Sequence, residues 1–101
     1  MNQDDSRKCP EGQQDFAGSC LPAVDFSTFV ISMASAAMVH LGDMPEPETG
    51  RTVQNLPLAK HTIDTLAMLE EKTRGNLTRE EATQLADLLG HLRMAFVRKA
   101  G

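Results

Sequence analysis

The chain has 101 residues, of which 41% are hydrophobic and only 4% aromatic, and its formal net charge at pH 7 is −4. A chain of this length forms one domain at most. The net negative charge does not neutralise phosphates, and four Phe with neither Trp nor Tyr give few aromatic rings on which bases could stack. Nucleic acid is therefore disfavoured as a partner, although Arg93, Arg98 and Lys99 form a basic cluster near the C-terminus.

The first part of the chain differs in composition from the rest. It combines Asp, Gln, Ser, Gly and Pro with a single Phe and follows no hydrophobic period, so we expect a disordered acidic tail over residues 1–24 and a single helical domain over residues 25–101. The polar, acidic N-terminus does not resemble a secretory signal, which predicts a cytoplasmic protein. Cys9 and Cys20 lie in this tail with no recognised zinc spacing, and we interpret them as free thiols because cytosolic disulfides are rare.

A helix is predicted over about residues 25–42. Residues 26–41 contain no Asp, Glu, Lys or Arg, and their spacing is helical. Asp25 is a suitable N-cap, and Gly42 suits the left-handed position that ends a helix. A helix that is apolar on nearly all sides must be buried on nearly all sides. The predicted interface is its most regular apolar face, formed by Phe26, Phe29, Val30, Met33, Ala37 and Leu41.

A membrane and a protein partner are the two environments that could bury this helix. A run of about 17 residues is at the bottom of the range for a membrane span. The run also contains Ser, Thr and His, and it is flanked by Asp25 and Asp43 instead of Lys or Arg anchors. Burial between protein helices is therefore the preferred interpretation, and a membrane is disfavoured.

Two further helices are predicted after a loop that contains proline. Asn55 is a suitable N-cap for a helix over about residues 56–74, and Gly75 suits its end. A capping box at residues 78–81 begins a helix over about residues 78–98, whose apolar residues recur at alternating three- and four-residue steps. Because the link is short, these helices form an antiparallel hairpin. The predicted fold is all-α: an apolar N-terminal helix plus an antiparallel helical hairpin.

No catalytic, cofactor-binding or metal-binding motif is recognised in the chain. His40, His61 and His91 are the candidate metal ligands, but each falls on a different predicted helix. Only Asp87 and His91 share an i, i+4 face, which is also an ordinary surface pair. No Ser/His/Asp or Cys/His arrangement and no Gly-rich phosphate loop can be assembled. We therefore expect a protein that is not an enzyme and uses no cofactor or metal.

Several short segments occur in an order that is familiar from a known family. They are Asp25-Phe26-Ser27-Thr28-Phe29, His40-Leu41-Gly42, Pro47-Glu48-Thr49-Gly50, Ile63-Asp64-x-Leu66, Lys72-Thr73-x-Gly75-Asn76-Leu77-Thr78 and Leu92-Arg93. Together they resemble a bacterial family known only as domain of unknown function 1844, over about residues 24–98. The resemblance implies a short bacterial helical protein. It carries no activity, cofactor or catalytic residue, and both cysteines lie outside it.

The predicted function is that of a non-enzymatic interaction protein, which associates with itself or docks on a larger protein through the apolar helix 26–41. A hairpin covers only part of a helix that is apolar on every side, and a C2 homodimer is the commonest way to cover the rest. Two alternatives stay open. One is association with a membrane surface through the same helix. The other is a small metal-binding or enzymatic protein that uses His40, His61 and His91.

Overall fold

The computed structural model describes residues 14–16, 19–21 and 24–101. Its helices are α1 (Phe26–Leu41), α2 (Leu56–Lys72) and α3 (Arg79–Ala100), and two short strands, β1 (Gln14–Phe16) and β2 (Ser19–Leu21), precede them. The all-α class with three helices is confirmed. Compared with the expected bounds, α2 ends two residues earlier and α3 continues two residues further.

The segment predicted as an acidic tail, residues 1–24, lies largely outside the described residues. Within it, β1 and β2 pair antiparallel, with Gln14 opposite Leu21 and Phe16 opposite Ser19. The sequence predicts no strand here, because a three-residue strand is too short for an alternating pattern to be recognised. Cys9 also lies outside the described residues, and the expected disorder of this part of the chain stays a prediction.

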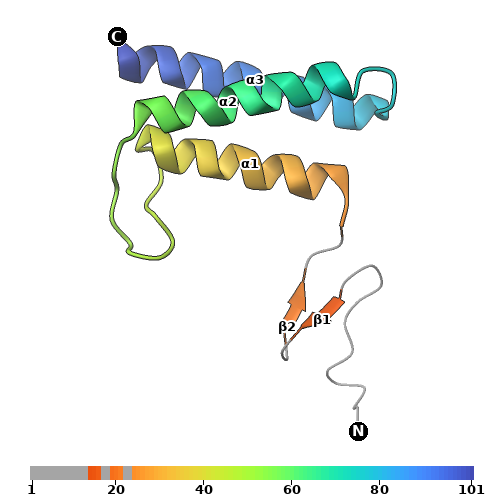
Figure 1. Ribbon diagram of the computed structural model, residues 1–101, viewed down its shortest axis with the longest axis horizontal. Coiled ribbons are helices and arrows are strands. Elements are labelled where there is room, and N and C mark those ends of the chain that lie inside the picture. Colours follow the sequence, from red (N-terminus) through yellow and green to blue (C-terminus); the bar gives the residue numbers. More distant parts are fainter. Residues whose placement is uncertain (1–13, 17–18, 22–23) are drawn as a thin grey trace, which may run out of the picture.

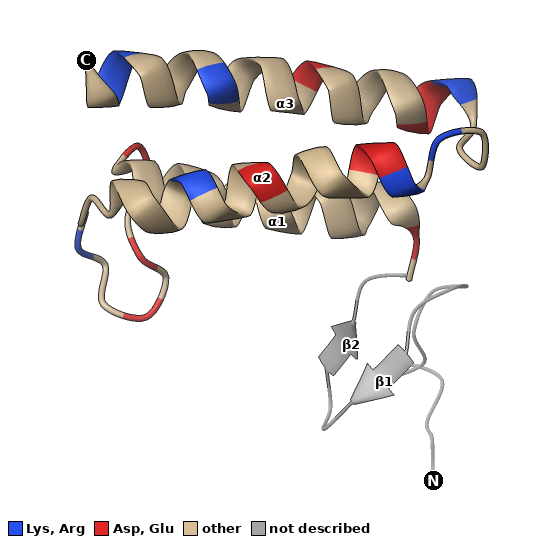
Figure 2. Cartoon of the chain, turned by 45° about the horizontal axis from the view of Figure 1, so that its top comes forward, with Lys and Arg blue, Asp and Glu red and all other residues tan. Residues whose placement is uncertain are grey.

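The three helices pack side by side around a shared core (Figure 1). α2 runs antiparallel to both α1 and α3, so α1 and α3 point in the same direction. A short link joins α2 to α3, whereas residues 42–55 form a longer loop at the opposite end of the bundle. α1 carries no charged residue over its whole length (Figure 2).

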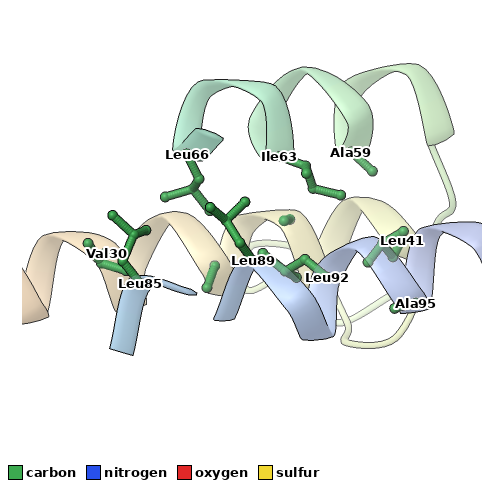
Figure 3. Close-up of a cluster of buried hydrophobic side chains, with 11 residues drawn as sticks. Val30, Leu41, Ala59, Ile63, Leu66, Leu85, Leu89, Leu92 and Ala95 are labelled. Carbon is green, nitrogen blue, oxygen red and sulfur yellow. The ribbon is translucent and has the colours of Figure 1, made fainter. Parts of the chain in front are cut away.

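One side of each helix contributes side chains to the core (Figure 3). Its largest fully buried side chains are leucines and a valine, and alanines of α1 and α2 lie between them. Small residues at these positions allow the helix axes to approach closely. The core residues are Val30, Ala34, Ala37, Leu41, Ala59, Ile63, Leu66, Leu85, Leu89, Leu92 and Ala95.

Local hydrogen bonds explain where the helices begin and end. The Asn55 side chain accepts a hydrogen bond from the backbone N–H of Leu58 at 3.0 Å. Thr78 Oγ1 accepts from the Glu81 N–H at 3.1 Å while Glu81 Oε1 accepts from the Thr78 N–H at 2.9 Å, which is the predicted capping box. Gly42 ends α1 with a φ of 86°, a conformation that costs glycine little and other residues more.

Asp25 begins α1, and its side chain gives a pH-dependent prediction. Asp25 Oδ1 accepts a hydrogen bond from the Thr28 backbone N–H at 2.7 Å. This bond, together with a hydrogen bond from the Thr28 side chain, holds the pKa of Asp25 below its ordinary value. A carboxylate with a lower pKa in the folded state stabilises the fold above its unfolded pKa of about 3.9, and this stabilisation is lost as the pH falls through the folded pKa.

We therefore expect the stability of the wild-type protein to fall more steeply below about pH 4 than that of Asp25→Asn. Asparagine is an equally good N-cap, but it does not titrate. Thermal unfolding followed by circular dichroism at a series of pH values measures both slopes. Equal slopes would contradict a stabilising role of the Asp25 carboxylate.

Candidate functional site

The apolar face that the sequence predicts as an interface lies against the chain's own α2 and α3. Val30, Ala37 and Leu41 have no exposed surface. Phe29 alone among the six predicted residues is exposed, at 49%. The candidate interface therefore lies on another side of α1, because packing this apolar face inside the chain already removes it from water. The two remaining residues, half-buried against the core, are Phe26 and Met33.

The outward side of α1 forms one wall of a groove. The loop after α1 forms the other wall, since residues 44–48 lie beside the helix. The groove has a volume of about 530 Å³. We call this surface the α1 groove and define it by the residues Ile31, Ser32, Ser35, Ala36, Val39 and Met44.

Contacts at both ends of the loop hold this wall of the groove in place. At the start of the loop, Asp43 Oδ1 lies 2.9 Å from Lys99 Nζ of α3, and both side chains are half-buried. At its end, the Asn55 N–H donates a hydrogen bond to the His40 carbonyl oxygen at 2.7 Å. The tip is closed by a turn in which the Gly50 N–H donates to the carbonyl oxygen of residue 46 at 2.8 Å. Contacts within the chain itself therefore fix the loop wall of the α1 groove.

The α1 groove has acidic residues on its loop wall only. The wall formed by α1 is uncharged along its length (Figure 2). The loop wall contributes Glu46 and Glu48. Such a surface suits an apolar segment that carries basic residues at its border.

The three candidate histidines lie on three different helices. His40 is in the last turn of α1 and borders the α1 groove, and His61 is exposed on α2. His91 is exposed on α3, with its Nδ1 3.1 Å from the Asp87 carbonyl oxygen. Among the described residues, no three His, Cys, Asp or Glu side chains are grouped as a metal site. In the same part of the chain, no helix is both long enough and apolar enough to cross a membrane.

The interface residues that the sequence predicts do not include the groove residues Ile31, Val39 and Met44. Ile31 and Val39 stand eight residues apart on one side of a helix, which is a usable signal, but a helix apolar all round gives several such sides. The place of Met44 depends on the path of the loop, which is determined by contacts far apart in the sequence.

A comparison with protein families finds a match that covers most of the chain. The model of a family described as Domain of unknown function (DUF1844) matches residues 23–98. This range includes α1, the loop, α2 and all but the last residues of α3. Neither the curated proteins nor the solved structures contain a significant match to the chain.

Proposed function

The chain belongs to the DUF1844 family of domains of unknown function, and from this premise we propose that it is a non-enzymatic interaction protein. It docks on a different protein through the α1 groove. One observation carries this proposal: after the three-helix core has formed, the uncharged α1 still presents an apolar groove to solvent. Ile31 is 49% exposed and Met44 37% exposed, so a partner that covers them removes further apolar surface from water.

The charges at the groove indicate the chemistry of the partner. A C2 dimer through the α1 groove would bring the same surface of two copies together, including Glu46 and Glu48 of each. Like charges so close oppose association. The partner that fits is therefore another protein, one that presents an apolar helix or extended segment bordered by Lys or Arg. The same acidic border argues against docking on an anionic membrane surface.

A paired substitution tests the proposal. In a pull-down from the native host with the tagged full chain, Ile31→Ser combined with Met44→Ser is expected to reduce capture of a specific partner by roughly tenfold, because the apolar contact is lost. The matched control is Leu58→Ser combined with Met68→Ser, since these α2 residues are 43% and 48% exposed and line no part of the groove. The control is expected to capture the same protein as the wild type.

A charge reversal distinguishes specific docking at the α1 groove from non-specific binding to exposed apolar side chains. Glu46→Lys combined with Glu48→Lys is expected to reduce capture of the same protein, because the border then repels its basic residues. Quantitative mass spectrometry of the captured proteins measures all four samples. Equal capture by the groove variants and the control, or no specific capture by the wild type, would contradict docking through the α1 groove.

A further inference from the structure

The solvent-facing side of α3 carries the most exposed large apolar side chains of the three helices. Met94 is 66% exposed and Val97 is 68% exposed. They border a shallow hollow of about 290 Å³, whose other residues are Arg93 and Arg98. Single exposed apolar side chains are ordinary. Here two neighbouring ones lie among guanidinium groups on one stretch of helix, which is the composition of an interface more than of a solvated surface.

In the first half of α3, the residues on the same side have small side chains. By helical spacing, Thr83, Ala86 and Gly90 continue the line of Met94 and Val97, and all five are exposed. A Cβ atom at Gly90 would meet nothing within 4 Å, so the chain's own packing does not require glycine there. Glycine inside a helix is nevertheless destabilising relative to alanine. The position leaves the backbone open to close approach by another helix.

The charges of α3 divide between its two halves (Figure 2). After Arg79 at its first residue, the first half carries acidic side chains and the second half basic ones. A helix with this pattern repels a parallel copy of itself, whereas it attracts an antiparallel copy. The acidic side chains are Glu80, Glu81 and Asp87, and the basic ones are Arg93, Arg98 and Lys99.

We propose that a second copy of this chain docks on the solvent-facing side of α3, with the two α3 helices antiparallel and crossing at Gly90 in a C2 dimer. Thr83 and Val97 are each seven residues from Gly90, and Ala86 and Met94 are each four residues from it. An antiparallel crossing therefore places the bulky side chains of one copy over the small ones of the other. It also places each basic half against an acidic half.

This dimer does not depend on the proposed partner of the α1 groove. None of these α3 residues lines that groove, although Ile31 at its border also lines a second hollow together with Glu80, Thr83 and Asp87. Met44 lies on the loop wall of the groove and outside that second hollow, so Met44→Ser alone is expected to weaken binding of the foreign partner and to leave the dimer intact. Loss of the foreign partner and loss of the dimer are then separate observations.

Two reversed-charge variants of the full chain test the dimer by sedimentation velocity. One carries Glu80→Lys and Asp87→Lys, and the other carries Arg93→Glu and Arg98→Glu. We expect the wild type to be dimeric at roughly 10 μM, and each variant alone to associate at least about tenfold more weakly, because like charges then face one another. An equimolar mixture is expected to recover a heterodimer, since each half then meets an opposite charge.

A further variant tests the close approach, and a control tests for a general effect of charge. Gly90→Leu is expected to keep the circular dichroism of a folded helical protein while weakening the dimer at least about tenfold, because the side chain fills the crossing point. The control, Glu70→Lys combined with Glu71→Lys, changes the net charge by the same amount as Glu80→Lys with Asp87→Lys, but on α2. It is expected to leave the dimer intact. Each of three results would overturn the proposal. The wild type could be monomeric at roughly 100 μM. The Gly90→Leu protein could dimerise as well as the wild type, or the mixture of reversed-charge variants could fail to form the heterodimer.

Discussion

Leu89→Ala is expected to lower the free energy of unfolding by about 2–5 kcal/mol. Leu89 is 1% exposed, and its side chain points toward Leu66 between the helices (Figure 3). Removing its isobutyl group takes away apolar contacts and leaves a cavity that the surrounding helices fill only in part. A helical domain this small is stabilised by only a few kcal/mol, so a large fraction of the variant is expected to be unfolded at 37 °C.

Urea denaturation followed by circular dichroism measures this loss. Leu58→Ala is the matched control, because it removes the same atoms from a leucine that is 43% exposed on α2. We expect the control to lose less than about 1 kcal/mol. Similar losses in the two variants would show that α3 does not pack in the core as described.

Ala37→Leu is expected to lower the free energy of unfolding by about 1–3 kcal/mol, although leucine is a good helix former. Ala37 has no exposed surface and lies on the side of α1 that packs into the core. Three additional carbon atoms have no space there, so either the helices separate or side chains adopt strained rotamers. Burial of a larger apolar side chain by itself raises the free energy of unfolding, whereas this substitution is expected to lower it.

Ala82→Leu serves as the control for this substitution. Ala82 is exposed in the first turns of α3, so the added side chain extends into solvent and the stability is expected to change by less than about 0.5 kcal/mol. Both variants are compared in the same urea titration. A stabilised Ala37→Leu protein would show that α1 lies more loosely on the other two helices than its burial implies.

The parts of the fold that the sequence predicts are those with local causes. Asp25, Asn55 and Thr78 each bond to an amide within three residues, so the start of every helix is visible in a short stretch of sequence. The same holds for Gly42 at the end of α1, where a positive φ is required. Helix bounds therefore agree with expectation to within two residues.

The location of the proposed docking surface was not predictable in the same way. The spacing of Val30, Ala37 and Leu41 correctly marks one face, but nothing local tells whether a face packs against the chain's own helices or against a partner. The α1 groove needs the loop to lie beside the helix, and that path is held by Asp43 and Lys99, which are far apart in the sequence. Long-range contacts of this kind leave no periodic signal.

The charge-free length of α1 also affects the chain before it has folded. Sixteen consecutive residues without charge form a segment that, when exposed, is prone to aggregate with copies of itself. Asp25 and Asp43 stand at its two ends. In stacked chains these carboxylates repel one another, so we expect them to act as gatekeepers against aggregation during synthesis. In the folded protein the same two residues begin the helix and anchor the loop that follows it.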